Sequence, residues 1–487
     1  MANTDVVKVG LITSCGKYLT AEQFGNIVSL VTTSLGPKQI WEVRFKSSKG
    51  LQVLVELIGS NGMALQTNED GLVKCAPPNE SSLFLLEYQS NGSWVFRSLI
   101  FGTYLEKNTD KVRCALKEAT KFQQWIPHLA IHPQIVLYHP QSKNYVRVDC
   151  NQGKSWAEAP APFSEECIFL IHFDSGKYHL QTSDRRYLSV ENQLLSTRSK
   201  QTGFVLHLKA GYMVSFSAGR RGVLYPHSRT GLLSIGTHPS DMQDIFIIKR
   251  SKPWISLKTK SKKYVTINYG VEVYARFETL SQLSLFQFEV NLNSDRVRLR
   301  TIDGQLLAQR RQAAILADGK DTEEATYFTV RWCQGKVMLQ AANKQYLTMK
   351  PIGQIVASAQ QAGPNEEFVM RLVNRPFLIL RGRHGYIGTD CHSDQLLCNR
   401  INYEIILLTP CKRGFYHFQG NNRKFWCTGA NGTFSVSGDV PLDFCIEIHA
   451  DNLLAVLAPN GCYLCSDHNG VLSASSTDIN NNSLWEF

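Results

Sequence analysis

Two cysteines, Cys462 and Cys465, have the spacing in this sequence that comes closest to a metal-binding or redox motif. Thiols three positions apart can hold a zinc ion or form a redox-active disulfide. A structural zinc site of this kind takes four ligands, and the sequence offers no second pair of cysteines at a matching spacing. We therefore interpret the two residues as ordinary thiols on a short strand, and we expect neither a metal site nor a cofactor.

A second candidate is the run Asp390-Cys391-His392, which places an acid, a thiol and an imidazole side by side. Nucleophilic catalysis needs a base held against the nucleophile and oriented by a third group. The run has no recognisable partner, and the sequence shows no carboxylate pair in a known motif, no triad spacing and no phosphate-binding loop. An enzyme is therefore the function that we expect least.

Positive charge is the remaining feature with chemical consequences, through binding rather than reaction. The 487 residues include 52 Lys and Arg against 41 Asp and Glu, which gives a formal net charge of +11. Such a balance favours an acidic partner: nucleic acid, an anionic membrane surface or an acidic filament. The charge is spread along the chain, with concentrations within residues 249–263 and at Arg185-Arg186, Arg220-Arg221 and Arg310-Arg311. No motif that reads RNA or DNA accompanies them, so we expect no nucleic-acid partner.

The sequence also limits the compartment in which the protein works. No run approaches the roughly 18 apolar residues that a membrane-spanning helix needs, so we expect no membrane insertion. The N-terminal residues lack a basic segment followed by a long apolar one, so we expect no secretory signal. The 13 cysteines are odd in number and scattered, as is typical of reduced thiols. These features predict a cytoplasmic protein.

An aromatic repeat indicates the fold that positions these side chains. An aromatic residue recurs about every 41 residues, and most copies lie in short strand-like runs such as WEVRF or FQFEV. Turns rich in Gly, Asn and Asp bound the runs, and no long stretch has the helical period of 3.6 residues. We expect the repeated residues, or anchors, to lie in the core, where each burial is worth roughly 1.5–3 kcal/mol. The anchors are Trp41, Phe84, Trp125, Phe169, Phe204, Phe246, Phe286, Phe328, Phe368, Tyr403, Phe444 and Trp485.

A period of this size is typical of a repeat architecture with about four short strands per repeat. A β-propeller usually has four to eight blades, and twelve repeats exceed that range. Twelve repeats divide instead into four β-trefoils of about 120 residues, which is a normal domain size. The sequence therefore predicts an all-β chain of four tandem β-trefoil domains, at residues 1–131, 132–252, 253–374 and 375–487.

Seven segments, in order along the whole chain, resemble a known family. They are KYLTAEQFG (17–25), SLGPKQIW (34–41), HLAIHPQ (128–134), SLFQFEV (284–290), PNEEF (364–368), NRPFLILRGRHGYIG (374–388) and SLWEF (483–487). With them the chain resembles the fascin family of actin-bundling proteins, which consist of four tandem β-trefoils, and most of all its divergent, testis-type branch. The resemblance implies a cytoskeleton-associated monomer that joins two filaments of actin. Joining filaments requires at least two filament-binding surfaces on one particle.

The resemblance also implies where one filament contact lies. In the family, a serine beside a basic run is phosphorylated to switch filament binding off, and Ser34 matches it. A phosphate adds nearly two negative charges to a basic contact, which explains the direction of that effect. Of the basic run only Lys38 remains here, and Gly36-Pro37 predicts a stiff, uncharged turn. Ser34 is thus a possible phosphosite within a weakened contact.

The other residues that the resemblance implies for actin binding are Lys17, Lys350, Arg375, Arg381, Arg383 and His384. The family has an acidic residue at the position of Arg383, so this patch is more basic here. Family lysines fall on Cys391 and Cys465, so two positive contacts are replaced by thiols. Each exposed charge is worth roughly 0.2–1 kcal/mol, so several losses together predict weaker bundling than in typical fascins.

Two further functions stay open at this point. A scaffold or adaptor would keep the fold, lose strong bundling and use the cluster Lys258–Lys263 for a different partner. A carbohydrate-binding trefoil would carry Gln-x-Trp in its repeats, and the sequence has this motif at residues 39–41 and 123–125. Two of twelve repeats is a weak signal, and sugar-binding trefoils of this type are usually secreted with disulfides.

Overall fold

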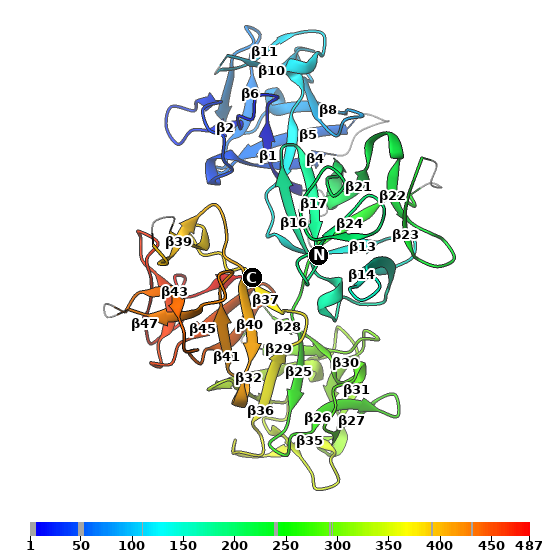
Figure 1. Cartoon of the computed structure of the whole chain (residues 1–487), viewed down its shortest axis with the longest axis vertical. Helices are drawn as coiled ribbons and strands as arrows, with labels where there is room; N and C mark the ends of the chain where they lie inside the picture. The colour runs from blue at the N-terminus through cyan, green and yellow to red at the C-terminus, as the bar shows by residue number, and fades with distance from the viewer. Residues whose placement is uncertain are drawn as a thin grey trace. The chain divides into compact units, whose positions relative to one another are not determined.

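The structure, a computed structural model, describes residues 6–46, 53–109, 111–237, 242–291, 294, 296–390, 393–429 and 432–487. Throughout these ranges the regular structure consists of β-strands and short 3₁₀-helices (Figure 1). The predicted all-β class is therefore confirmed. None of the helices in the described ranges has the length and hydropathy that crossing a bilayer requires.

The strands of the described residues fall into four consecutive sets of twelve, called sets 1 to 4. Set 1 consists of β1 (Val6–Ile12), β2 (Thr20–Ala21), β3 (Val28–Ser29), β4 (Ile40–Lys46), β5 (Val53–Gly59), β6 (Ala64–Thr67), β7 (Val73–Ala76), β8 (Leu83–Tyr88), β9 (Trp94–Ser98), β10 (Tyr104–Asn108), β11 (Lys111–Leu116) and β12 (Ile126–Leu129). Set 2 consists of β13 (Gln134–His139), β14 (Asn144–Asp149), β15 (Lys154–Ala159), β16 (Phe169–Asp174), β17 (Lys177–Gln181), β18 (Tyr187–Leu188), β19 (Leu194–Leu195), β20 (Val205–Leu208), β21 (Met213–Ser217), β22 (Val223–Pro226), β23 (Leu233–Gly236) and β24 (Phe246–Arg250).

The second half of the chain repeats this count. Set 3 consists of β25 (Trp254–Lys258), β26 (Tyr264–Asn268), β27 (Glu272–Phe277), β28 (Phe286–Val290), β29 (Arg296–Arg300), β30 (Leu306–Gln309), β31 (Ile315–Gly319), β32 (Phe328–Cys333), β33 (Lys336–Gln340), β34 (Tyr346–Met349), β35 (Ile355–Ala359) and β36 (Phe368–Leu372). Set 4 consists of β37 (Phe377–Leu378), β38 (Tyr386–Thr389), β39 (Leu396–Arg400), β40 (Ile406–Pro410), β41 (Tyr416–Gln419), β42 (Phe425–Thr428), β43 (Phe434–Gly438), β44 (Cys445–Ala450), β45 (Leu453–Leu457), β46 (Tyr463–Ser466), β47 (Leu472–Ser476) and β48 (Trp485–Glu486).

Single 3₁₀-helical turns connect many of these strands. They are η1 (Pro37–Gln39), η2 (Glu80–Ser82), η3 (Lys121–Gln123), η4 (Glu165–Cys167), η5 (Ala210–Tyr212), η6 (Gly219–Arg221), η7 (Gln282–Ser284), η8 (Arg311–Ala313), η9 (Glu324–Thr326) and η10 (Lys412–Gly414). In η1, Pro37 occupies the first helical position, where its missing N–H costs no hydrogen bond. The predicted stiff turn at Gly36-Pro37 is therefore confirmed as the start of η1.

Within each set, six strands form a closed ring and the other six form hairpins. In set 1 the ring runs through β1, β4, β5, β8, β9 and β12, and β12 pairs with β1 again. Set 3 closes in the same way through β25, β28, β29, β32, β33 and β36. Single bridges complete the rings of sets 2 and 4, and in set 4 the closing bridge joins Arg381 to Glu486. The remaining strands pair in sequence, as β2–β3, β6–β7 and β10–β11 do in set 1.

The anchors occupy one repeated register in these rings. Each lies opposite a residue of the preceding ring strand. The pairs are Val9 with Trp41, Val55 with Phe84, Trp94 with Trp125, Ile135 with Phe169, Tyr178 with Phe204, Val214 with Phe246, Ile255 with Phe286, Val297 with Phe328, Val337 with Phe368, Leu378 with Ile406, Tyr416 with Phe444 and Leu454 with Trp485. All twelve of these anchor side chains are buried.

One predicted anchor is wrong. Tyr403 is only half-buried and packs its ring on that of Tyr386, with the centroids 5.6 Å apart. Ile406 takes the anchor position in β40, because it pairs with Leu378 as Phe286 pairs with Ile255. An aliphatic side chain therefore replaces the aromatic one in the tenth repeat, and a search for aromatic spacing alone selects a residue three positions too early.

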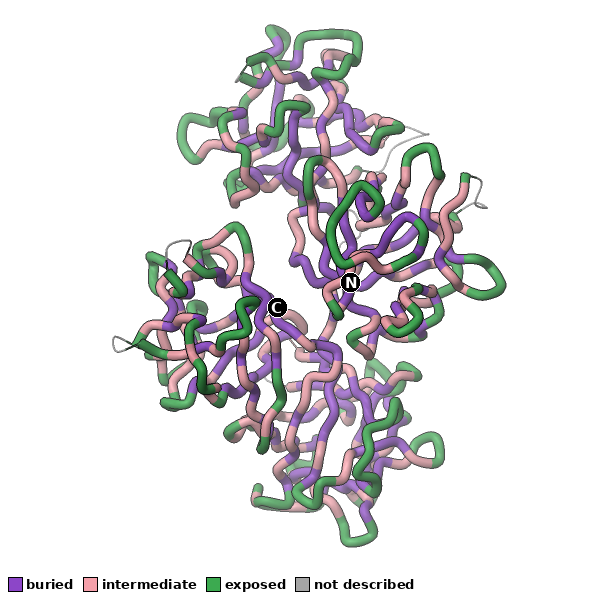
Figure 2. The backbone as a smooth tube through the Cα atoms, in the orientation of Figure 1, coloured by how far each residue is buried: buried purple, intermediate pink, exposed green. Residues whose placement is uncertain are grey.

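The chain divides into two compact units. Unit 1 comprises the residues up to Ala159 and Phe169–Arg250, and unit 2 comprises Pro160–Ile168 and Ser251–Phe487. Buried apolar side chains of sets 1 and 2 join in one core cluster, and those of sets 3 and 4 join in another. Figure 2 shows this burial following the strands, while the connecting turns are mostly exposed. Each unit is therefore stabilised by a core to which two strand sets contribute.

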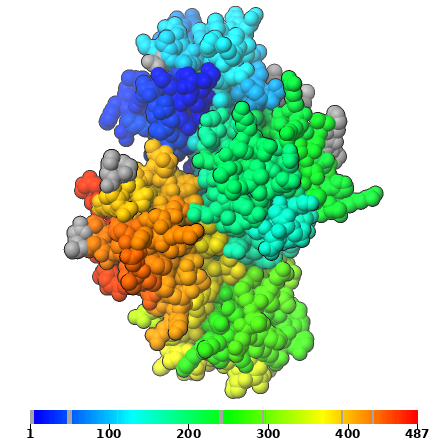
Figure 3. Space-filling model, viewed as in Figure 1, coloured from blue at the N-terminus to red at the C-terminus, as the bar shows by residue number. Residues whose placement is uncertain are grey.

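Sets 3 and 4 meet closely inside unit 2. In the space-filling view the surface of set 3, green to yellow, continues into that of set 4, orange to red (Figure 3). A Cβ added at Gly414 would lie 1.8 Å from the backbone oxygen of Gly335, and Gly414 has a φ of +89°. Both the contact and the backbone angle therefore require glycine at this position. The turn that carries Gly414 is thus pressed against set 3.

Candidate functional site

The first predicted contact lies on set 1, in the turns at either end of the short β2–β3 hairpin. Lys17 ends the turn after β1 and is half-buried, and its N–H donates to Thr13 Oγ1 at 3.2 Å. Ser34 is also half-buried, with its hydroxyl 3.3 Å from that of Thr32. Tyr18 N donates to Thr32 O at 2.9 Å, so the Lys17 turn runs beside the segment that leads to Ser34. The structure therefore brings these two predicted residues into one neighbourhood.

Lys38 is exposed, but it is already engaged within the chain. Its Nζ lies 3.5 Å from Glu22 Oε2, and the other oxygen of Glu22 accepts a hydrogen bond of 2.7 Å from Ser29 Oγ. An exposed ion pair is worth little for stability. It nevertheless reduces the positive potential that Lys38 presents to an external anion.

A thiol close to Lys17 is a feature that sequence reasoning missed. Lys107 Nζ donates to Cys15 Sγ at 2.8 Å, although 92 positions separate the two residues. Desolvation raises the pKa of the Cys15 thiol, but the hydrogen bonds from Lys107 and Thr13 outweigh it and lower that pKa to about 7. No local pattern could have indicated this contact, because it depends on β10 lying beside the first turn.

The loop between β2 and β3 and the residues just after it expose apolar side chains. Phe24 is 84% exposed, Ile27 56% and Val31 64%. Lone exposed apolar residues are ordinary, whereas three within eight positions, beside Lys17 and Lys38, form a mixed apolar and basic surface. We call Lys17, Lys38, Phe24, Ile27 and Val31 the N-terminal surface.

A second basic surface lies on set 3, in unit 2. The turn after β25 carries Lys260 and Lys262, and its Ser261 Oγ lies 3.9 Å from Met349 Sδ. Met349 directly precedes Lys350, whose N–H donates to Gln354 O at 2.8 Å to close the next turn. Residues almost 90 positions apart in the sequence are thereby brought together.

A third segment completes this surface. Arg276 Nε donates to Ile352 O at 3.4 Å, and the Arg276 guanidinium lies 4.1 Å from the centre of the Tyr274 ring. We call Lys258, Lys260, Lys262, Lys263, Arg276 and Lys350 the lysine surface. Within the described residues, none of these six side chains forms an ion pair, and Lys260, Lys262, Arg276 and Lys350 are exposed. The lysine surface therefore presents its charge directly to solvent.

The third predicted contact is the turn between β37 and β38. Gly382 N donates to Gly385 O at 2.8 Å, and Gly385 has a φ of +151°, so the turn exposes Arg383 and His384 at its tip. Arg381 is half-buried, with its guanidinium 3.6 Å from Glu486 Oε2 and 5.4 Å from the centre of the Tyr386 ring. Of the three side chains, only Arg383 and His384 are thus positioned to meet a partner.

The structure corrects the expected location of Arg375. The resemblance implies a surface residue, but Arg375 is 3% exposed. Its guanidinium donates to Ser251 Oγ at 2.6 Å and to Ser251 O at 2.7 Å, within unit 2. A buried guanidinium has to be hydrogen-bonded, and Arg375 meets that need by joining the start of set 3 to the start of set 4. It is therefore excluded from the candidate surface.

Of the two cysteine motifs, the structure describes Cys462 and Cys465 and, from the run Asp390-Cys391-His392, only Asp390. Cys465 lies in β46 with its Sγ 3.2 Å from Ser475 Oγ, and both Cys462 and Cys465 are free thiols. Within the described residues, neither belongs to a group of three potential metal ligands. Of the run Asp390-Cys391-His392, Cys391 and His392 lie outside the described residues, while Asp390 pairs with Arg400 at 2.5 Å.

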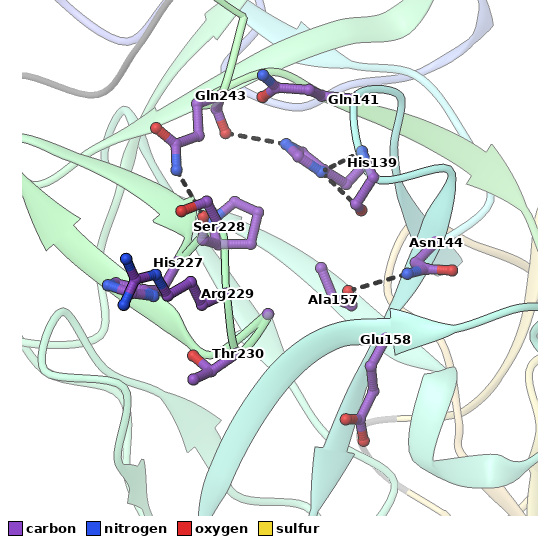
Figure 4. A pocket seen from close by; sticks show the side chains of 13 residues that line it. His139, Gln141, Asn144, Ala157, Glu158, His227, Ser228, Arg229, Thr230 and Gln243 are labelled. Atoms are coloured by element: carbon purple, nitrogen blue, oxygen red, sulfur yellow. Dashed lines mark hydrogen bonds between the residues drawn. The ribbon is translucent and has the colours of Figure 1, made fainter.

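Unit 1 also contains an open pocket of about 470 Å³ between the β13–β14 turn and the loop after β22. His139 lines it, but Nδ1 of its ring lies 2.8 Å from Ser142 Oγ and Nε2 lies 3.0 Å from Gln243 O (Figure 4). Burial also lowers the pKa of His139. Glu158 on the opposite side pairs with Arg147 at 2.7 Å. His139 and Glu158 thus both interact with other residues of the chain, and their side chains do not converge on one point of the pocket.

Comparison with known proteins gives relatives that cover 99% of the chain and a family model that matches within its second half. The family model described as the Fascin domain matches residues 260–370 and 383–487. Fascin-3 of Mus musculus is 39% identical over 483 residues, which covers 99% of this chain and 97% of that protein. Fascin-3 of Homo sapiens is also 39% identical with the same coverage, and Fascin-2 of Mus musculus is 29% identical over 485 residues, which covers 99% of this chain and 98% of that protein.

Proposed function

The chain belongs to the fascin family and is more similar to fascin-3 than to fascin-2, and on that premise we propose that it binds filamentous actin and joins filaments into bundles. The observation that carries the proposal is the identity of 39% along almost the entire length of a fascin. The role is non-enzymatic, and it suits a cytoplasmic monomer associated with the cytoskeleton.

The exposed basic surfaces support this proposal physically. Actin filaments are acidic, so basic side chains attract them, and the attraction speeds encounter and weakens with salt. Unit 1 offers the N-terminal surface, with Ser34 beside it. Unit 2 offers the lysine surface, which includes Lys350, and the turn that follows Arg381 and exposes Arg383 and His384. Each unit therefore has at least one surface of its own, as a particle that joins two filaments requires.

We propose further that each strand set is one β-trefoil, with boundaries at residues 131, 252 and 374. A closed ring of six strands with three hairpins in each set supports this division. A rigid barrel suits the function, because binding surfaces on stiff domains hold two filaments at a defined spacing better than surfaces on flexible tails.

Sedimentation with filamentous actin tests the function. Filaments with bound protein pellet at high speed, whereas cross-linked bundles also pellet at low speed. We expect the full-length protein to pellet with actin at both speeds. Pelleting at high speed alone would indicate a single site and would favour the scaffold or adaptor. The internal pairing of Lys38 with Glu22 and of Arg381 with Glu486 supports that alternative, because each pair reduces the positive charge presented to actin. No pelleting at either speed would refute actin binding.

The same assay tests regulation at Ser34. A Ser34→Glu variant adds negative charge beside Lys17 and Lys38, so we expect it to pellet less at both speeds. Thr33→Glu is the matched control, because Thr33 is exposed and directly precedes Ser34 in the chain. Equal loss in both variants would point to general repulsion instead of a specific site.

A further inference from the structure

Three side chains of set 4 bring potential metal-binding atoms together. Cys411 Sγ lies 3.4 Å from Asp443 Oδ1, and His417 Nε2 lies 3.0 Å from the same oxygen. All three atoms lie within 4.8 Å of one another. Among the residues that the structure describes, no other group of three His, Cys, Asp or Glu side chains converges in this way.

The ring strands of set 4 hold these residues in place. Cys411 directly follows β40, and its N–H donates to Phe415 O at 2.9 Å across the turn into β41. His417 is the second residue of β41 and pairs with Thr409 of β40. Asp443 directly precedes Phe444, which exchanges two backbone hydrogen bonds of 2.8 and 2.9 Å with Tyr416. The three ligand atoms therefore come from neighbouring, paired segments.

Set 3 supports the turn from the other side. The guanidinium of Arg371 donates to the backbone oxygens of Cys411 and Phe415, the latter at 3.2 Å. Leu372 N donates to Tyr416 Oη at 2.9 Å. The backbone on both sides of Cys411 and His417 is thus fixed to β36, so little ordering remains for a bound ion to impose.

The distances suit a tetrahedral ion. With a metal–sulfur bond of about 2.3 Å and metal–nitrogen and metal–oxygen bonds of about 2.0–2.2 Å, the ligand atoms of a tetrahedral zinc site lie roughly 3.3–3.8 Å apart. The two separations from Asp443 Oδ1, 3.0 and 3.4 Å, are close to that range. The third separation, between Cys411 Sγ and His417 Nε2, is within 4.8 Å, so a bound ion would draw these two atoms together by up to about 1 Å.

The donor set selects the kind of metal. A thiolate, an imidazole and a carboxylate together suit Zn²⁺, whereas Ca²⁺ and Mg²⁺ take oxygen ligands. Cys411 and His417 are half-buried and Asp443 is exposed, so an ion can enter from solvent. We propose that Cys411, His417 and Asp443 bind one Zn²⁺ ion, with water as the fourth ligand. Binding replaces the thiol proton of Cys411, which leaves to solvent.

This proposal reverses the expectation of no metal site and does not depend on actin binding. The sequence drew attention to Cys462 and Cys465, whose spacing is familiar. In the proposed site, His417 lies six positions after Cys411, and Asp443 lies twenty-six positions after His417. Only the pairing of β40, β41 and the segment before β44 brings the three residues together.

Titration of the full-length protein with Zn²⁺ against a chromophoric chelator tests the site. We expect wild-type protein to take up one Zn²⁺ with an affinity that Cys411→Ser, His417→Gln and Asp443→Asn each lower by at least about 100-fold, more than the roughly 10–100-fold that loss of a supporting residue costs. Cys427→Ser is the matched control, because Cys427 is also half-buried in set 4 but its thiol lies beside Ser435 and Ser437. A double variant, Cys462→Ser with Cys465→Ser, is the second control.

A measurement on the wild-type protein keeps the test independent of variant folding. Co²⁺ in place of Zn²⁺ should give a tetrahedral spectrum with a sulfur-to-cobalt charge-transfer band of one thiolate. No uptake of Zn²⁺, a spectrum with no thiolate or with two, or equal loss of affinity in the Cys427 or the Cys462 and Cys465 controls would overturn the proposal.

Discussion

The two units differ in where they keep their ionisable side chains. Unit 1 withdraws imidazoles from solvent: the histidines whose pKa burial lowers are His128, His139, His172, His179 and His207, all of them in unit 1. Unit 2 instead displays the lysine surface, whose cations face solvent without ion pairs among the described residues. We therefore expect acid to lower the stability of unit 1. We expect binding by the lysine surface to depend on its charge and on salt concentration.

His128 shows how unit 1 acquires this response. Its ring stacks on Phe173 with the centroids 4.1 Å apart, and Nδ1 lies 2.7 Å from the hydroxyl of Tyr18. Burial lowers the pKa of His128 to about 4. The neutral His128 side chain, on β12, therefore contacts both Tyr18 of set 1 and Phe173 of set 2, and protonation would place a charge among aromatic rings.

The largest expected effect is loss of unit 1 stability in acid. Folded His128 binds a proton only below about pH 4, whereas in the unfolded chain it does so below about pH 6.5. Between these values the unfolded state binds more protons, so the free energy of unfolding is highest above pH 6.5 and falls by roughly 2–3 kcal/mol as the pH drops to 4. Hydrogen exchange, corrected for its intrinsic pH dependence, should show peptides of unit 1 losing protection before those of unit 2.

A His128→Gln variant sharpens this prediction. It should be less stable at pH 7 but should lose less additional stability between pH 7 and 4, since one titrating group is gone. His384→Gln, which replaces an exposed histidine of unit 2, is the control for the substitution itself. Simultaneous loss of protection in both units at low pH would contradict the proposed difference between unit 1 and unit 2.

The next effect concerns actin binding by unit 2. Replacing Lys260, Lys262 and Lys350 with Glu should weaken binding by about tenfold or more, because each exposed charge contributes roughly 0.2–1 kcal/mol and 1.4 kcal/mol is tenfold. High-speed sedimentation over a range of actin concentrations measures the affinity. The loss should shrink at high salt, where screening acts over shorter distances.

A control for net charge uses three exposed lysines of set 2, as Lys143→Glu, Lys154→Glu and Lys200→Glu. It changes the total charge by the same amount in a set that contributes no residue to the predicted surfaces. Equal weakening by both triple variants would mean that the lysine surface attracts filaments only through the overall charge of the protein.

The smallest effect concerns the ion pair of the N-terminal surface. Glu22→Gln keeps an oxygen for Ser29 Oγ but removes the charge that faces Lys38. Lys38 would then present its full charge, and affinity for actin should rise by about two- to fivefold, the range that one exposed pair can supply. Glu69→Gln, at an exposed site elsewhere in set 1, is the control. An unchanged affinity would show that Lys38 does not contact the filament.

The fold was predictable because its main signal is repeated twelve times. Eleven of the predicted anchors are buried, each within a strand or directly before one, since a core position tolerates few alternatives to a large apolar side chain. The tenth failed because Ile406 fills the same space without being aromatic. The aromatic character of a side chain thus identifies the anchor position less reliably than the strand register does. The register itself cannot be read from the sequence.

The candidate surfaces were predictable only in part. Ser34 and Arg383 lie in turns, as their sequence context indicates, but nothing local shows that Arg375 is buried against Ser251 or that Glu22 faces Lys38. The lysine surface depends on the contact between Ser261 and Met349, 88 positions apart. Interactions between distant repeats decide which charges remain exposed, and such interactions leave no pattern in a single sequence.

Ring closure also has a consequence for how the chain folds as it is made. In set 1 the first strand pairs with the last, so Val9 meets Leu129 only after the intervening repeats have been synthesised. Until then one edge of β1 has unpaired backbone groups, and such an edge can join a strand of another chain. Contacts this distant in sequence also slow folding. Each set therefore passes through an open, aggregation-prone stage during translation, which ends when its twelfth strand leaves the ribosome.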